Sequence, residues 1–293
     1  MNFDEKYLKI KNLVADDLYK IENNLTDFYC GCDELQENLI KIIKAPSKRI
    51  RPLLAILYLK MYNKEITYEQ IEIQSAVELI HNATLIHDDV IDKSPKRRNN
   101  KTINETFDNS LAVVTGDFLL SVAIQKLLNV KSCDILSFFS VAIKRMSLGE
   151  ISQYFNKFKL ITFDEYLDKC RYKTAELFIA SLISSASIAG LDLNKTKDFA
   201  KRFGTAFQIR DDLLNAIETT SDKPTRNDIE DGIYTAPMIF AKDIKNLDYG
   251  IEKTKELLDN YFNRVGKCLT NAPDNEYKQA IIELTEILKV NDR

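Results

Sequence analysis

Two short clusters of carboxylates have the residue types and the spacing of a cation site. The first is Asp88-Asp89-Val90-Ile91-Asp92, directly after His87. On a helix, residues four positions apart share a face, so Asp88 and Asp92 would point the same way with Asp89 on their flank. Carboxylates this close repel one another unless a cation neutralises them, and their hard oxygens suit Mg²⁺. The cluster predicts a magnesium site, although an isolated cluster of this kind is more often a solvated helix end.

The second cluster, Asp211-Asp212-Leu213-Leu214-Asn215, repeats the spacing later in the chain with Asn in the third position. Each cluster follows an apolar helical run and precedes a polar loop with basic residues. Two such sets on facing helices could hold a diphosphate between them through bridging Mg²⁺ ions. The pair is therefore a stronger signal for polyphosphate chemistry than either cluster alone.

Basic residues stand close to the acidic clusters in the sequence. Lys48 and Arg51 are three positions apart, which predicts one helical face, and the arginine fork suits phosphate oxygens. His81 precedes Asp88 by two helical turns; a lone His on an apolar helix is usually a core residue, but here a phosphate contact is as plausible. The other candidates are Arg97, Arg98, Lys173 with Thr174, and Lys223. The net charge of −3 argues against a nucleic-acid-binding protein.

The elements that must position these residues are helices. The chain has only 8 Gly and 6 Pro, too few for many β-hairpin turns, and its apolar residues recur at spacings of three and four. We expect one all-α domain over residues 1–293, with about ten to thirteen helices around a central cavity. The longest apolar-looking stretch, Leu177 to Leu191, is interrupted by serines and shorter than the ~20 residues of a transmembrane helix. No signal peptide is visible, and five cysteines with no metal-binding spacing predict free thiols and a cytoplasmic location.

From about residue 40 to about residue 240 the motifs resemble the trans-isoprenyl (polyprenyl) diphosphate synthases. The first aspartate motif lies in a family-like stretch from Glu78 to Asp89, and Phe207-Gln208 precedes the second. The run Gly116 to Leu120 and the pair Lys173-Thr174 also match. The resemblance implies the isoprenoid synthase fold, a homodimer, and a prenyltransferase that joins isopentenyl diphosphate to an allylic diphosphate, farnesyl or geranylgeranyl, with three Mg²⁺ ions when substrate is bound.

The resemblance also implies roles for single residues. Isopentenyl diphosphate would be bound by Lys48, Arg51, His81 and Arg98. The allylic diphosphate would be bound by Arg97, Lys173, Thr174, Gln208 and Lys223. The implied metal ligands are Asp88, Asp89, Asp92, Asp211, Asp212 and Asn215, and the aspartates together with Lys173 are the predicted catalytic set. Metal and cations would stabilise the charge on the departing diphosphate, so that an allylic carbocation forms. The released diphosphate would accept the final proton, so no side-chain base is expected.

The sequence departs from the family pattern at five places. Glycines of the family are replaced by Pro46-Ser47, by Asn99 and by Arg226; the third residue of the second motif is Asn215; and an expected Lys is Ile233. These changes predict weaker allylic binding or, in the more severe case, a catalytically weak subunit of a heteromeric synthase. A terpene cyclase is a further alternative, but it would not need the cations at Lys48, Arg51 and Arg98.

The residues before the first motif predict the length of the product. In the family, bulky aromatics four and five positions before the first Asp close the tunnel for the growing chain. Here these positions are Thr84 and Ala83, with Ile80, Val77 and Ala76 below them. We therefore expect a product longer than farnesyl diphosphate, which would be handed on to a membrane. If a side chain from another helix closed the tunnel, the chain would instead be a short-chain synthase making farnesyl or geranylgeranyl diphosphate.

Overall fold

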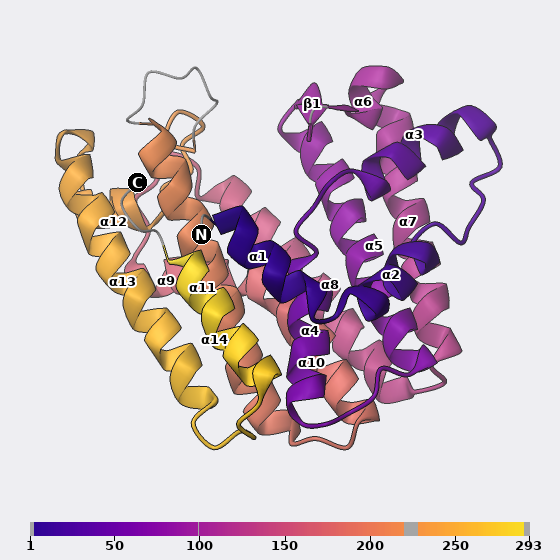
Figure 1. Ribbon diagram of the computed structural model, residues 1–293. Helices are drawn as coiled ribbons and strands as arrows, with labels where there is room; N and C mark the ends of the chain where they lie inside the picture. Colours follow the sequence, from indigo (N-terminus) through magenta and orange to yellow (C-terminus); the bar gives the residue numbers. More distant parts are fainter. Residues whose placement is uncertain (1–2, 99, 220–227, 290–293) are drawn as a thin grey trace. The chain divides into compact units, whose positions relative to one another are not determined.

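The computed structural model describes residues 3–98, 100–219 and 228–289. Helices dominate this part of the chain, and the predicted all-α class is confirmed (Figure 1). The elements are α1 Phe3–Asn12, α2 Ala15–Asn24, α3 Asp33–Lys44, α4 Ile50–Met61, α5 Tyr68–Ile91, β1 Lys96–Arg97, β2 Asn100–Lys101, α6 Ile103–Thr106, α7 Asn109–Asn129, α8 Cys133–Phe155, α9 Phe163–Cys170, the π-helix η1 Arg171–Ala175, α10 Glu176–Ile188, α11 Leu193–Thr219, α12 Ala236–Ala241, the 3₁₀-helix η2 Ile244–Asn246, α13 Leu247–Cys268 and α14 Glu276–Leu288.

The described residues contain fourteen α-helices, slightly more than the sequence predicted. The short helices α6 and α12 have four and six residues, too few to produce a periodic apolar pattern. Two antiparallel strands of two residues each, β1 and β2, lie in the polar stretch after α5. The chain forms two compact units, Lys11–Leu136 and Met1–Ile10 with Ser137–Arg293, so the single domain over 1–293 stays a prediction.

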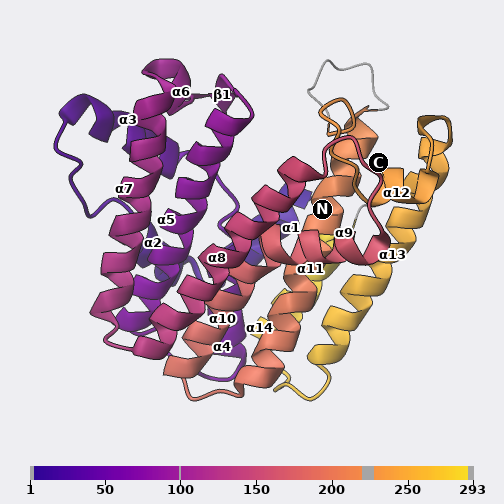
Figure 2. The same ribbon diagram turned by 180° about the vertical axis from the view of Figure 1, so that it is seen from behind.

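In the unit Lys11–Leu136, helix α5 carries the first aspartate motif at its C-terminal end. The helix begins with a capping box, in which the backbone N–H of Thr67 donates to Oε1 of Gln70 across 3.1 Å. Most of its residues are buried, and it runs alongside α7 (Figure 2). Gly116 of α7 permits the close approach, because a Cβ there would lie 2.2 Å from Nε2 of His87. This packing of α7 against α5 fixes the backbone of α5 at His87, directly before the first aspartate motif.

Helix α7 is long and apolar enough to cross a membrane, which Leu177 to Leu191 is not. By length and composition it is the one such helix in the described residues, with 44% of its apolar window buried. Its apolar residues are explained in part by packing, since the buried side of α7 lies against α5. A packed core helix meets the same test of length and hydropathy as a membrane span.

In the unit that contains Ser137–Arg293, helix α11 carries the second motif and packs against α10, η1 and α13. The approach of α11 to η1 is close: a Cβ at Gly204 would lie 2.6 Å from the Cα of Ala175. On the α8 side, a Cβ at Gly149 would lie 3.2 Å from the backbone nitrogen of Lys173. Helix η1 is therefore held between two glycines, which fixes the backbone of Lys173 and Thr174.

One local prediction is wrong. Lys48 and Arg51 were expected on one helical face, but α4 begins at Ile50 and Arg49 adopts left-handed backbone dihedrals with φ 48°. Lys48 therefore lies before the helix, and only Arg51 is on it. The cause is tertiary, because the Arg49 side chain is tied to residues distant in the sequence, as described below.

Candidate active site

The first aspartate motif combines a buried, paired carboxylate with more accessible ones. Asp89 is 4% exposed. Its carboxylate accepts hydrogen bonds from Arg97, with Nε 2.8 Å from Oδ1 and 3.0 Å from Oδ2, and Nη2 2.7 Å from Oδ1. Burial raises the pKa of Asp89, and the Arg97 guanidinium opposes that rise. Asp89 therefore orients Arg97, a residue predicted to bind the allylic diphosphate.

Asp88 and Asp92 lie at the C-terminal end of α5, where the backbone carbonyls already create negative potential. Asp88 is half-buried in the last turn, whereas Asp92 is exposed and caps the helix. The last turn contains no basic residue. Acidic side chains at a helix C-terminus cost stability unless a cation is nearby. This arrangement favours cation binding at Asp88 and Asp92.

The second motif has the same arrangement. Asp212 is 4% exposed, and both of its carboxylate oxygens accept hydrogen bonds from the protein: Oδ2 from the hydroxyl of Tyr166 at 2.7 Å and Oδ1 from Nε2 of Gln208 at 2.7 Å. Asp211 is exposed, with Nη1 of Arg210 3.3 Å from its Oδ1. In each motif the first aspartate is accessible and the second is buried and used within the protein.

Tyr166 holds Asp212 from a fully buried position on α9. Burial and the charge of Asp212 raise the pKa of the Tyr166 phenol well above its ordinary value. The hydroxyl therefore stays protonated and donates a hydrogen bond to the carboxylate of Asp212. Cys170, one helical turn later, is also buried beside Tyr166, and burial raises the pKa of its thiol. Cys170 is therefore a protonated core residue.

Lys173 and Thr174 lie in the π-helix η1, a feature that often marks functional sites. The Thr174 hydroxyl forms a short hydrogen bond to Oε1 of Gln208, which in turn donates to Asp212. Lys173 pairs with Oε1 of Glu150 at 3.0 Å and lies 3.5 Å from Oε1 of Gln153. The structure thus brings Lys173, Thr174, Gln208 and the second motif into one hydrogen-bonded region.

Asn215, the third residue of the second motif, is connected to a residue that the sequence analysis did not select. Its Oδ1 accepts a hydrogen bond from the backbone N–H of Asp228 at 3.4 Å. Burial, followed by the charge of Asp212, raises the pKa of the Asp228 carboxyl to about 6 against the opposing charges of Lys169 and Lys173. Asp228 therefore belongs to the same charged region.

The residues predicted to bind isopentenyl diphosphate lie in the other unit. Burial and the guanidinium groups of Arg51 and Arg98 lower the pKa of His81 well below its ordinary value. His81 is thus a neutral group among cations, which suits an anion. Lys48 is exposed and precedes α4.

Arg49 fixes the backbone between Lys48 and Arg51. It is 5% exposed, and its guanidinium donates to both carboxylate oxygens of Glu22 at 2.6 and 3.1 Å and to Oε2 of Glu78 at 2.9 Å. It also forms a short hydrogen bond to the backbone carbonyl of Ile43. A buried guanidinium with this many acceptors has a single geometry, so Arg49 sets where α4 begins.

The donor set fits a divalent metal that is shared with a substrate. No group of three or more His, Cys, Asp or Glu side chains in the described residues is arranged to hold a metal by itself. Mg²⁺ usually binds through one or two carboxylates together with substrate phosphates and water, so such a group is not required. Asp88 with Asp92, and Asp211 with Asn215, would each supply one or two oxygens.

Three predicted residues concern product length, and one binding residue cannot be placed. Ala83 and Ile80 are buried in α5, whereas Thr84 is half-buried and donates to the backbone carbonyl of His81 at 2.8 Å. Lys223 lies outside the described residues, as do the departures at Asn99 and Arg226.

Sequence reasoning missed Tyr166, Glu150, Arg49 and Asp228. Tyr166 and Glu150 lie in helices with ordinary periodic patterns, so nothing local sets them apart. Arg49 was passed over although it stands between two selected residues. The signal that could have found Asp228 is its position in the polar stretch that follows the second motif.

The model of the family described as polyprenyl synthetase matches residues 32–271. A prenyl transferase of Cyanophora paradoxa is 32% identical, over 84% of this chain and 86% of its own. Solanesyl diphosphate synthase 1, chloroplastic, of Arabidopsis thaliana is 37% identical over 78% of this chain, and the match spans 59% of that protein.

A similar fold is found in the crystal structure of a polyprenyl synthase from Caulobacter crescentus complexed with calcium and isoprenyl diphosphate. Its TM-score is 0.86 at 24% identity, over 96% of this chain and 97% of that one. At this identity the likeness concerns the fold, and it agrees with the isoprenoid synthase type expected from the sequence.

Proposed function

Because the chain belongs to the polyprenyl synthetase family and is a prenyltransferase, we propose that it condenses isopentenyl diphosphate with an allylic diphosphate in a Mg²⁺-dependent reaction. The observation that carries this proposal is the common arrangement of the two aspartate motifs. Asp89 and Asp212 are buried and hydrogen-bonded, while Asp88 and Asp211 are more accessible. Such a site offers each metal few protein oxygens and leaves room for phosphate.

The residues divide into ligands and positioning groups. We assign the metal-binding oxygens to Asp88, Asp92, Asp211 and Asn215. Asp89 and Asp212 act mainly by orienting Arg97 and Gln208, although each keeps lone pairs that could reach a metal. When bound, Mg²⁺ supplies positive charge that stabilises the departing diphosphate. Three ions, and Mg²⁺ rather than another divalent cation, are part of the proposal.

The chain's own cations would hold the allylic diphosphate while its carbon–oxygen bond breaks. The proposal is supported by the ion pairs of Arg97 with Asp89 and of Lys173 with Glu150, which orient these two cations, and Lys223 stays a predicted third cation. Arg51, His81 and Arg98, with Lys48, would hold the diphosphate of isopentenyl diphosphate. The double bond of isopentenyl diphosphate then attacks the allylic carbocation, and the released diphosphate takes the proton.

We propose a product longer than farnesyl diphosphate. The support is that two small residues, Ala83 and Thr84, stand where bulky aromatic side chains would close the tunnel, with Ile80 below them. The Arabidopsis relative is named for solanesyl diphosphate, a long-chain product. A short-chain product stays the alternative, and product analysis distinguishes the two.

We propose that the enzyme is a homodimer. In the unit Lys11–Leu136, several large apolar side chains are exposed on α7: Val113, Val114, Ile124 and Leu128. Exposed apolar surface of this extent usually marks an interface. Light scattering coupled to size-exclusion chromatography should give a mass twice that of the 33.7 kDa chain, and Leu128→Lys should lower it.

The location of the protein is a separate matter. The Arabidopsis relative is described as chloroplastic, so it does not support the cytoplasmic location predicted here. Cytoplasmic location and transfer of the product to a membrane stay predictions.

The proposed reaction is tested by incubating the purified chain with labelled isopentenyl diphosphate, an allylic diphosphate and Mg²⁺. Incorporation of label that requires all three is expected. Absence of incorporation with dimethylallyl, geranyl, farnesyl and geranylgeranyl diphosphates would reject the proposal for the chain alone and favour a weak subunit that needs a partner.

A further inference from the structure

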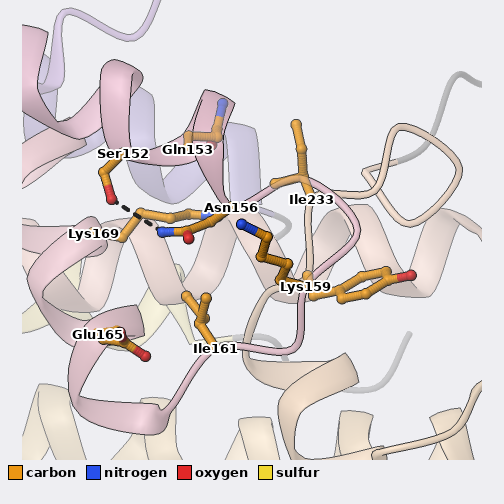
Figure 3. Close-up of a pocket in the computed structure, with 9 residues that line it drawn as sticks. Ser152, Gln153, Asn156, Lys159, Ile161, Glu165, Lys169 and Ile233 are labelled. Atoms are coloured by element: carbon orange, nitrogen blue, oxygen red, sulfur yellow. Dashed lines mark hydrogen bonds between the residues drawn. The ribbon is translucent and has the colours of Figure 1, made fainter.

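A polar pocket with two lysines lies at the C-terminal end of α8. We call it the lysine pocket. It is a shallow pocket: the space between its residues is about 330 Å³ only when the open solvent at its mouth is included. All of its lining residues belong to the unit that contains Ser137–Arg293 (Figure 3). They are Ser152, Gln153, Asn156, Lys159, Ile161, Glu165, Lys169, Ile233 and Tyr234.

The wall of the lysine pocket is fixed by the loop after α8. The backbone N–H of Phe158 donates to the carbonyl of Gly232 across 2.7 Å. Gly232 has φ +73°, and a Cβ there would lie 2.6 Å from the Phe158 ring, so only glycine allows this contact. Lys159 follows Phe158 and Ile233 follows Gly232 in the sequence. The contact therefore keeps Lys159 and Ile233 in the lining of the same pocket.

The cations of the pocket differ in their partners. Lys159 donates to the backbone carbonyl of Phe155 at 2.9 Å. Lys169 forms no hydrogen bond or ion pair with the described residues, although it is only half-exposed. The one carboxylate that lines the pocket, Glu165, caps α9 by accepting from the N–H and the hydroxyl of Thr162, both at 2.8 Å. Figure 3 shows this carboxylate turned away from the two lysines.

The lysine pocket adjoins the residues assigned to the allylic diphosphate. Gln153 lines the pocket and is also 3.5 Å from Nζ of Lys173. Lys169 acts electrostatically on Asp228 together with Lys173, and the backbone of Asp228 bonds to Asn215. An anion in the pocket would therefore lie close to the second motif, beside the side-chain amides of Gln153 and Asn156, which also donate to Glu150 and to Ser152 across 3.3 Å.

We propose that Lys169 is a further diphosphate-binding residue and that the lysine pocket takes part of the diphosphate of the allylic substrate, or the inorganic diphosphate released from it. This inference rests on the proposed function. Ile233 contributes no charge to the lining, so the positive charge of the pocket comes from Lys159 and from Lys169 on α9. The unpaired ammonium and the neutral donors suit a phosphate group.

The test compares Lys169→Ala with Lys169→Arg and with the control Lys197→Ala, which removes an exposed lysine near the start of α11. We expect Lys169→Ala to raise the KM for the allylic diphosphate about tenfold, equivalent to roughly 1.4 kcal/mol. In the same variant, the KM for isopentenyl diphosphate and the kcat should each change by less than about twofold. Lys169→Arg should retain binding. Adding Ile233→Lys to Lys169→Ala should restore it, because the new ammonium enters the same pocket.

Binding of inorganic diphosphate with Mg²⁺, followed by calorimetry, provides a readout that does not depend on turnover. Weaker binding to Lys169→Ala than to Lys197→Ala supports the pocket, even if the native chain proves inactive with every allylic substrate. Equal binding to both variants would overturn the inference, and so would a fall in kcat without a change in the allylic KM. Thermal melting of each variant verifies that it is folded.

Discussion

The phenol of Tyr166 lies 2.7 Å from Oδ2 of Asp212, and both side chains are buried. With Gln208 on Oδ1, this contact uses both oxygens of the second aspartate in the motif. The Asp212 carboxylate therefore links α9 to α11. This link fixes the backbone of α11 at the motif and so the orientation of the neighbouring residue, Asp211.

Tyr166→Phe removes a donor from the buried carboxylate of Asp212. The free energy of unfolding should fall by about 1–3 kcal/mol, the usual cost of an unsatisfied buried acceptor, and the Mg²⁺ concentration for half-maximal activity should rise. Urea unfolding and metal titration measure the two effects. Tyr249→Phe, at a 57% exposed position of α13, is the matched control. Equal behaviour of the two variants would show that the hydrogen bond does not position the motif.

Asp88 and Asp89 should respond differently to substitution. Asp89→Asn and Arg97→Lys alter two groups in direct contact, so their effects on kcat/KM should be non-additive, with a coupling of about 0.5–3 kcal/mol. Asp88→Asn combined with Arg97→Lys should be additive within about 0.5 kcal/mol. Steady-state kinetics of the single and double variants gives both couplings. Equal coupling in the two cycles would contradict the division into ligand and positioning residues.

Arg49 should matter for isopentenyl diphosphate although it is not assigned to bind it. Glu78→Gln removes one of the negative charges that balance the buried guanidinium of Arg49. Breaking a buried ion pair lowers the free energy of unfolding by about 3–5 kcal/mol. We expect lower stability and a raised KM for isopentenyl diphosphate, with the allylic KM less affected. Asp198→Asn removes an exposed ion pair with Arg202 and is the control, with an expected cost of about 0–1 kcal/mol. An equal rise in both KM values would indicate general loosening of the fold.

Ala83→Phe should shorten the product. The aromatic ring would fill space one turn or more before Asp88, whereas Ala76→Phe, seven positions earlier on α5, would block about 10 Å further along at 1.5 Å per residue. We therefore expect a shorter product from Ala83→Phe than from Ala76→Phe, measured by chromatography of the dephosphorylated products. Ile244→Phe, at a 57% exposed position of η2, is the control. Unchanged product length in a folded, active Ala83→Phe variant would show that another side chain sets the length.

His81 should make stability depend on pH. Burial and the nearby arginines lower its pKa in the folded state below the ordinary value of 6.5. The unfolded chain then binds more protons between these two pKa values, so the free energy of unfolding falls as pH drops below about 6.5 and is fully present above it. Urea unfolding across this pH range should show a smaller slope for His81→Gln than for the control His87→Gln. Equal slopes would contradict the assigned environment.

The sequence predicted the long helices, because their apolar residues recur at helical spacing. Apolar residues at spacings of three and four before Asp88 and before Asp211 predicted helices α5 and α11, and the repeated carboxylate spacing located both motifs. It could not separate Asp88 from Asp89, because both are aspartates on adjacent positions; only the contact with Arg97 shows that Asp89 is buried and paired.

The remaining features depend on contacts between residues far apart in the chain. The left-handed backbone at Arg49 follows from Glu22 and Glu78, and it moves Lys48 off α4. The π-helix that carries Lys173 has no local sequence signature. Likewise, the lysine pocket depends on the contact of Phe158 with Gly232, two residues in separate polar stretches.

The most direct test of the account is product analysis after incubation of the purified chain with labelled isopentenyl diphosphate, Mg²⁺ and farnesyl diphosphate. We predict labelled polyprenyl diphosphates longer than farnesyl diphosphate, formed only when the metal is present. Farnesyl diphosphate as the sole product from dimethylallyl or geranyl diphosphate would contradict the long-chain assignment. No labelled product from any allylic diphosphate would contradict the proposal that this chain alone is the catalyst.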